Sequence, residues 1–121
     1  MNTQLKNNII NQLGYDELNQ ECLELLADVA RYGAQCGFSG FIYYTETVQF
    51  FKDNKSDIIE LVKVQADDMG ENLIDFIQSF RCLDATEDEI GETIWSDDAD
   101  TFVANALSWF ALESLAYELE G

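Results

Sequence analysis

The chain has 121 residues, with 24 acidic side chains, 6 basic side chains and no histidine, so its formal net charge at pH 7 is −18. A hydrophobic share of 47% is too high for a disordered acidic tail, and the length suits one domain, residues 1–121. The negative charge argues against direct binding to DNA, RNA or anionic membranes, because such binding needs lysine and arginine to displace counterions.

Proline is absent, and apolar residues recur at steps of three and four along most of the chain. This periodicity predicts an all-α fold, a single compact bundle of six or seven helices. We expect a first helix over residues 3–13, ended by Gly14, and a second over residues 16–35. The buried stripe expected on the second helix is Leu18, Cys22, Leu25, Leu26, Val29 and Tyr32.

The segment GAQCGFSG, residues 33–40, has three glycines within eight residues. Gly33, Gly37 and Gly40 predict a tight, non-helical corner. Cys36 within it is interpreted as a small buried packing residue. Core packing is also favoured for the surrounding aromatic residues, whereas an apolar patch exposed there would indicate a protein partner or a homodimer. These aromatic residues are Tyr32, Phe38, Phe41, Tyr43 and Tyr44.

Helix caps punctuate the rest of the chain. Thr45 and Ser56 are expected to cap two helices, of which the second buries Ile58, Ile59, Leu61, Val62 and Met69 and is closed by Gly70. A short helix over residues 72–80 should follow. Thr86 and Glu89 have the spacing of a capping box, which predicts a helix over residues 87–95 that buries Ile90, Ile94 and Trp95. The last helix, from Asp98 to Glu120, is apolar around its circumference, Phe102 included, and should lie centrally.

Residues 84–100, DATEDEIGETIWSDDAD, carry eight carboxylates and no positive charge. Duplex DNA has about one charge per 110 Å². A net charge of −18 spread over the roughly 6,600 Å² expected for this mass gives only about one per 370 Å². Eight acids within about 1,000 Å² would approach the density of DNA. The candidate partner-binding residues are Asp84, Glu87, Asp88, Glu89, Glu92, Asp97, Asp98 and Asp100.

Further carboxylates extend this pattern. A secondary acidic patch is expected at Asp67, Asp68, Glu71 and Asp75, and Glu113, Glu118 and Glu120 line the last helix. The alternative interpretation is an ordinary solvated face, with Asp97, Asp98 and Asp100 stabilising a helix N-terminus.

Catalytic and metal chemistry find few suitable residues. Aligned on a calcium-binding EF-hand loop, the acidic segment places Glu89 where glycine is needed and Trp95 where the bidentate glutamate belongs. Without histidine, zinc and iron sites have few ligands, and a nucleophile lacks its usual base. We therefore expect a protein that is not an enzyme and has no metal and no cofactor.

The environment of the protein is also indicated. Cys22, Cys36 and Cys82 are widely spaced, and the N-terminal sequence lacks the apolar core of a secretion signal. No segment reaches the run of about 18 apolar residues that a membrane span needs. We expect a soluble protein of the cytoplasm.

The stretch YGAQCGFSGFIYYTETVQFFKDNKSDIIEL and the closing NALSWFALESLAYEL resemble small proteins encoded by phages and prophages, mostly of unassigned role. The resemblance covers roughly half of the chain, leaves out residues 84–100, and offers no catalytic residues. It suggests an inhibitor that imitates nucleic acid in the basic groove of a host defence protein, such as a CRISPR effector or a restriction enzyme, inside the host cytoplasm. The alternative is a phage structural or adaptor protein that binds through the glycine-aromatic corner.

Overall fold

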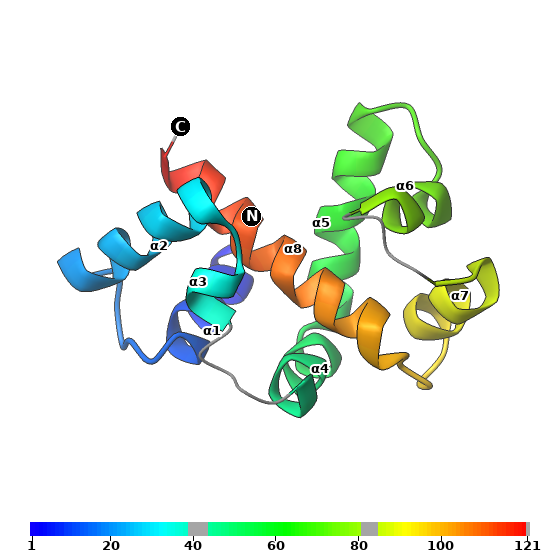
Figure 1. Ribbon diagram of the computed structural model, residues 1–121, viewed down its shortest axis with the longest axis horizontal. Helices are drawn as coiled ribbons and strands as arrows, with labels where there is room; N and C mark the ends of the chain where they lie inside the picture. Colours follow the sequence, from blue (N-terminus) through cyan, green and yellow to red (C-terminus); the bar gives the residue numbers. More distant parts are fainter. Residues whose placement is uncertain (39–43, 81–84, 121) are drawn as a thin grey trace. The chain divides into compact units, whose positions relative to one another are not determined.

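The computed structural model describes residues 1–38, 44–80 and 85–120, and within these ranges the chain is helical, with no strand. The all-α prediction is confirmed. With the single-turn α3 set aside, seven helices remain, in agreement with the six or seven expected. In chain order (Figure 1) the helices are α1 (Thr3–Gln12), α2 (Gln20–Tyr32), α3 (Gln35–Phe38), α4 (Tyr44–Asp53), α5 (Lys55–Asp68), α6 (Leu73–Ser79), α7 (Glu87–Trp95) and α8 (Thr101–Glu120).

The contacts between helices divide the chain into two compact units. The first comprises Met1–Tyr43 with Trp109–Gly121, and the second comprises Tyr44–Ser108, so the boundary falls inside α8. The expectation of one domain stays a prediction. No described helix combines the length and apolar character needed to cross a membrane.

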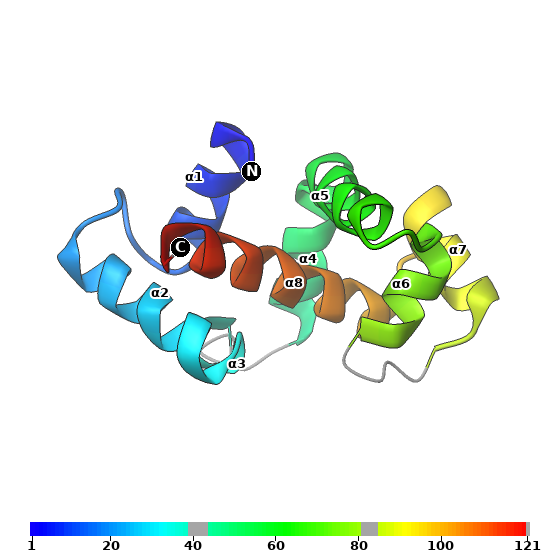
Figure 2. The ribbon, with the colours of Figure 1, turned by 90° about the horizontal axis from the view of Figure 1, so that it is seen from above.

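In the first unit, asparagine caps set where the helices begin. Asn2 accepts the backbone N–H of Leu5 at 2.8 Å, and Asn19 accepts that of Cys22 at 2.9 Å. The helix α2 therefore begins at Gln20, four residues later than expected, with Asn19 as its N-cap. In Figure 2, α1 and α2 lie on either side of the C-terminal half of α8. The buried apolar residues of α1 and α2 are Leu5, Ile9, Ile10, Cys22, Leu26 and Val29.

The glycine-rich corner differs from the expectation in three respects. The helical turn α3 runs through it, although Gly33 has a φ of 111° and ends α2. Cys36 is exposed, because it is Gly37 that lies against the packed side chains of Leu13, Val29 and Leu112. Tyr32 is 61% exposed, since it is the last residue of α2. Gly40, Phe41 and Tyr43, and the side chains of Phe38, Tyr44 and Thr45, lie outside the described residues.

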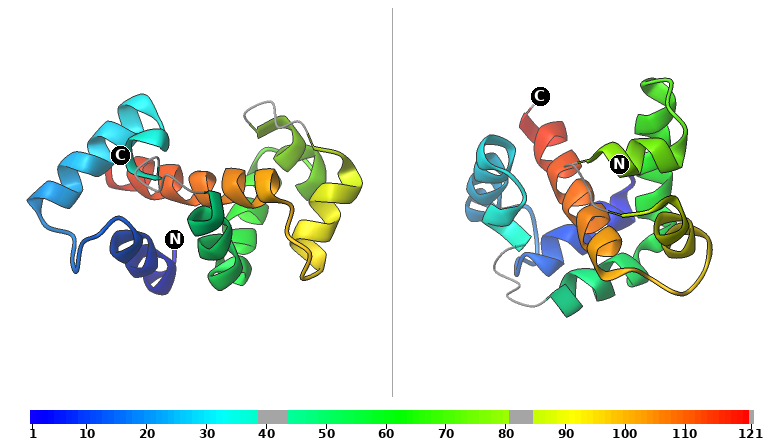
Figure 3. Two further views of the ribbon diagram at one scale, coloured as in Figure 1. Left: turned by 60° about the horizontal axis from the view of Figure 1, so that its bottom comes forward. Right: turned by 45° about the vertical axis from the view of Figure 1, so that its right-hand side comes forward.

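In the second unit, α4 packs against the N-terminal half of α8 (Figure 3). Thr47 Oγ1 donates to Asn105 Oδ1 at 2.6 Å, and Ser108 Oγ donates to the Thr47 carbonyl at 2.7 Å. These two bonds satisfy polar groups that α8 would otherwise leave buried and unpaired. The apolar residues buried in this unit include Phe50, Phe51, Ile58, Val62, Ile77, Ile90 and Leu107.

The junction between α4 and α5 is tighter than the sequence indicates. Asn54 is buried and donates its side-chain amide to the Phe50 carbonyl at 2.9 Å, and α5 begins at Lys55. Ser56 therefore lies inside α5 and is not its cap. Met69 follows the last residue of α5 and is 58% exposed, so its expected burial is also wrong.

Helix α6 begins after an asparagine cap, and helix α7 follows its predicted cap. Asn72 accepts the N–H of Asp75, and Thr86 and Glu89 form both bonds of the predicted capping box. Trp95, however, is 69% exposed because it ends α7, and Thr93 is buried on that helix in its place.

The burial expected of the last helix is confirmed in both units. The buried apolar residues of α8 are Val103, Ala104, Ala106, Leu107, Ala111, Leu112, Leu115 and Ala116. Phe102, in its first turn, is 63% exposed, so its expected burial is wrong.

Candidate functional site

The helix α7 presents the centre of the predicted acidic surface. Glu87, Asp88 and Glu89 form its first turn, where the positive end of the helix dipole favours carboxylates. Glu89 is committed to structure, because its carboxylate accepts the Thr86 N–H at 3.2 Å. Glu87, Asp88 and Glu92 are exposed. Asp88 and Glu92 are four residues apart, so about 5–6 Å separates their Cβ atoms, a spacing at which like charges repel.

The loop from α7 to α8 separates exposed acids from a structural one. Asp97 and Asp98 are exposed. Asp100 is half-buried, and its carboxylate accepts the backbone N–H groups of Phe102 at 3.0 Å and Val103 at 3.1 Å. It therefore caps α8, which is the helix-terminal role that the alternative interpretation assigned to it. A phosphate surrogate needs free carboxylate oxygens, and Oδ1 of Asp100 already accepts both of these bonds.

Five of the eight predicted contact residues thus combine exposure with no capping role. Among the residues that the structure describes, the one ion pair joins the N-terminal amine to Glu118 at 3.6 Å, so lysine and arginine neutralise none of the five. Asp84 lies outside the described residues. The five, named the α7 acidic surface from here on, are Glu87, Asp88, Glu92, Asp97 and Asp98.

The secondary acidic patch is similarly mixed. Asp67 and Asp68 are exposed in the last turn of α5, where the helix dipole disfavours negative charge by about 0.3–1 kcal/mol each. Asp75 lies in the first turn of α6, and its carboxylate accepts the side-chain amide of Asn72 at 2.8 Å. Glu71 is half-buried, and its Oε2 has no hydrogen-bond partner within the described part of the chain.

The two acidic runs meet at one small hollow of about 320 Å³ in the second unit. Asp75 contributes from the first turn of α6 and Glu87 from the first turn of α7. Its other lining residues are Asn72, Leu73, Ile74 and Trp95. Tertiary structure therefore brings one member of the secondary patch beside the α7 acidic surface.

Two acids of α8 are engaged in contacts within the first unit. Glu113 is 7% exposed and accepts the backbone N–H of Ala34 at 3.0 Å, and Glu118 pairs with the N-terminus. The side chain of Glu120 lies outside the described residues.

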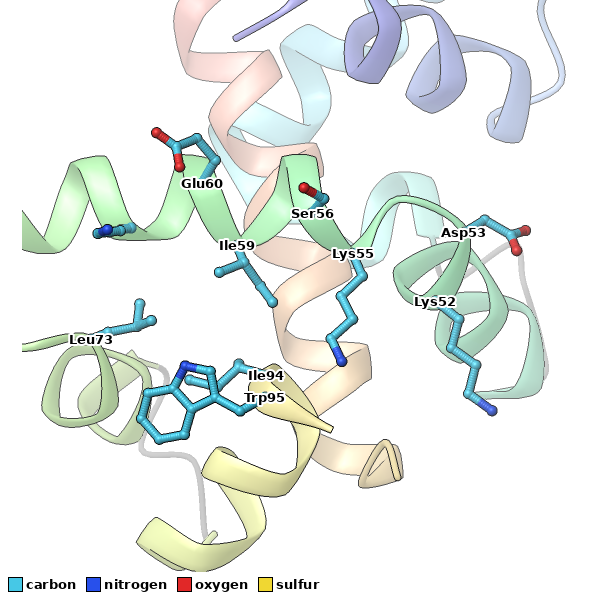
Figure 4. Close-up of a pocket in the computed structure, with 10 residues that line it drawn as sticks. Lys52, Asp53, Lys55, Ser56, Ile59, Glu60, Leu73, Ile94 and Trp95 are labelled. Carbon is cyan, nitrogen blue, oxygen red and sulfur yellow. The ribbon is translucent and has the colours of Figure 1, made fainter. Parts of the chain in front are cut away.

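A larger cavity of about 850 Å³ is also lined by Trp95, and sequence reasoning missed it (Figure 4). Three of the six basic residues of the chain, Lys52, Lys55 and Lys63, line it. The signal in the sequence that could have indicated this cavity is the grouping of these three lysines within twelve positions of an otherwise acidic chain. The remaining lining residues are Asp53, Ser56, Ile59, Glu60, Leu73, Ile94 and Trp95.

The thiols and the metal-ligand types offer little further chemistry. Burial raises the pKa of the Cys22 thiol, which keeps it protonated and a poor nucleophile. Cys36 is exposed, and Cys82 lies outside the described residues. Within residues 1–38, 44–80 and 85–120, no three histidine, cysteine, aspartate or glutamate side chains are grouped so that they could hold a metal ion.

The model of a family described as a domain of unknown function, DUF7222, matches residues 2–120. Neither the curated proteins nor the solved structures contain a match to this chain.

Proposed function

We propose that this protein, a member of the DUF7222 family of domains of unknown function, is a non-catalytic binding protein. In this proposal its α7 acidic surface imitates the phosphates of a nucleic acid. Its partner would be a protein with a basic groove that normally holds DNA or RNA. The resemblance to small phage and prophage proteins supports a target in host defence, such as a CRISPR effector or a restriction enzyme in the host cytoplasm.

One observation carries the proposal: five exposed carboxylates lie on or just after a nine-residue helix, and within the described residues none of them forms an ion pair. A helix of this length spans about 13 Å, so these acids are dense compared with the mean for the chain. Repulsion among them disfavours the folded state, and lysine and arginine from a partner would relieve it. Charge-assisted bonds from those cations would then supply specificity and a fast association rate.

The test compares two quadruple variants of equal charge change. The first changes Asp88, Glu92, Asp97 and Asp98 to lysine, which leaves the capping residues Glu89 and Asp100 intact. The control changes Glu17, Glu21, Glu24 and Asp28 to lysine, which are exposed residues of the first unit. Fluorescence anisotropy would measure how each protein displaces labelled duplex DNA from purified restriction enzymes and CRISPR effectors, after circular dichroism has verified that both variants are folded.

We expect the wild type and the control to displace DNA, and the α7 variant to need at least a hundredfold higher concentration. Displacement should weaken as salt is raised, because screening shortens the reach of each charge. If both variants lose DNA displacement equally, the displacement depends on net charge and not on the α7 acidic surface. Displacement that survives in the α7 variant, or that ignores salt, would favour the adaptor alternative through the glycine-aromatic corner.

A further inference from the structure

The lysine-lined cavity differs from the rest of the surface in charge. Lys52, Lys55 and Lys63 are the lysines of the second unit, and all three line this cavity. Charges that serve only solubility would be interspersed over the surface. Because the three lysines are grouped beside the exposed Trp95, they attract negative charge at this place. Screening limits that attraction to about 8 Å at physiological salt.

The cavity has a regular spacing along α5. Lys55, Ile59 and Lys63 follow one another at four-residue intervals, so they lie along one face of the helix, with the two lysines about 12 Å apart. In Figure 4, Lys55 and Ile59 point toward Ile94 and Trp95 of α7. The cavity therefore has an apolar floor with a cation toward each end.

Lys55 is held in place by the opposite wall. Its ammonium donates to the backbone carbonyl of Ser96, which follows the last residue of α7, at the negative end of the helix dipole. A lysine ammonium has three donors, so this bond positions Lys55 and leaves it able to bind a carboxylate.

Neither acidic lining residue forms an ion pair with these lysines among the described residues. Asp53 accepts the side-chain amide of Gln49 at 2.8 Å, which engages its carboxylate along α4. In Figure 4 the carboxylate of Glu60 points away from Trp95. The sides of Ile59 and Trp95 that face the cavity are thus flanked by lysine.

We propose that this cavity is a docking groove for an amphipathic acidic helix of a partner protein. That helix would carry one apolar residue, with one carboxylate four positions before the apolar residue and another four positions after it. The apolar residue would pack on Ile59, Ile94 and Trp95, and the two carboxylates would reach Lys55 and Lys63. The 12 Å between the lysines equals the rise of eight helical residues, which is the separation of the two carboxylates.

Charge and exposure favour this occupant over others. A small-molecule site buries most of its ligand, whereas Lys52, Lys63 and Trp95 are themselves exposed. Nucleic acid would meet the carboxylate of Glu87, which lines a hollow together with Trp95, in a protein of net charge −18. The proposal uses different residues from the α7 acidic surface and stands if that surface has no partner.

The test titrates the whole protein with an alanine-based helical peptide that carries Glu, Leu and Glu at positions i, i+4 and i+8. Binding should change the fluorescence of Trp95, and Trp95→Phe should remove that change. Lys63→Glu should weaken the affinity at least tenfold, whereas Lys6→Glu, an equal charge change in the first unit, should leave it within twofold. Lys63→Gln, a milder change at an exposed helix position, should weaken it by an intermediate factor.

Three controls can overturn the proposal. A peptide with lysine in place of both glutamates should not bind, and equal binding would leave charge without a role. If a single-stranded oligonucleotide binds and Lys63→Glu abolishes that binding, the groove belongs to nucleic acid. Glu60, Val64 and Asp68 on α5 have the same acid-apolar-acid spacing, so self-association in sedimentation that Lys63→Glu abolishes would make the occupant a second copy.

Discussion

The backbone N–H of Ala34 donates a hydrogen bond of 3.0 Å to the carboxylate of Glu113, and both residues are buried although 79 positions separate them in the sequence. Gly33 ends α2 immediately before this bond, and α3 begins immediately after it. The carboxylate thus fixes the glycine-rich corner to α8 within the first unit. In an acidic protein, this glutamate has a structural role.

Replacement of Glu113 by alanine should lower the free energy of unfolding by about 1–3 kcal/mol, because the Ala34 N–H would remain buried without its acceptor. Glu113→Gln keeps an acceptor oxygen and should lower it less. Urea denaturation followed by circular dichroism measures both changes. Equal effects of the two variants would mean that the lost charge, and not the lost acceptor, destabilises the protein.

Asp100 and Asp98, two residues apart, should differ in their contribution to stability. Asp100→Ala removes the acceptor for two backbone N–H groups at the start of α8 and should lower the stability by about 0.5–2 kcal/mol. Asp98→Ala changes an exposed residue and should stay within about 0.5 kcal/mol of the wild type. Thermal unfolding of the two single variants decides the matter, and indistinguishable midpoints would contradict the capping role.

Replacing glycine by alanine should lower the stability of the protein at Gly37 and raise it at Gly91. At Gly37 a Cβ atom would lie 2.9 Å from Leu112 Cδ2 and 3.0 Å from Leu13 Cδ2, so overpacking should lower the stability by about 1–3 kcal/mol. At Gly91, inside α7, the nearest atoms belong to the exposed Trp95 at 3.4 Å, and the gain in helix propensity should raise it by about 0.5–1 kcal/mol. Chemical denaturation of both variants tests the opposite signs, and a stabilising Gly37→Ala would refute the close packing at that residue.

The described thiols should react with alkylating reagents at very different rates. In a Cys82→Ser background, exposed Cys36 should react quickly, whereas buried Cys22 should react only when the protein unfolds. Mass spectrometry after timed alkylation checks these rates.

Burial raises the pKa of Cys22 above its ordinary value of 9.0, so the folded state holds this proton more tightly than the unfolded state. Its contribution to stability is therefore complete at neutral pH and is lost as the pH rises above 9.0 toward the folded-state pKa. Compared with the wild type, Cys22→Ala should lose less stability as the pH rises above 9.0, as measured by denaturation at several pH values.

Local signals allowed much of the helical structure to be predicted from the sequence. The capping box at Thr86 and Glu89 and the positive φ of Gly14 and Gly70 involve neighbouring residues, so sequence spacing is sufficient to predict them. The apolar stripe of α1 follows from periodicity, and the burial of most of α8 follows from its apolar residues on all sides. Errors fell where a helix begins later than expected, as α2 does after the cap Asn19, or where a large aromatic residue ends a helix, as Trp95 does.

The sequence by itself determined that this is an all-α protein with a dense run of acids in residues 84–100, because helix periodicity and charge are local properties. Only the tertiary structure decided which acids are available for binding. It selected Asp100 among three candidate acids as the cap of α8, buried Glu113 against Ala34, and left the α7 acidic surface without an ion pair among the described residues. It also gathered three lysines and Trp95 around one groove, since that arrangement depends on how α4, α5 and α7 pack, which spacing along the chain does not encode.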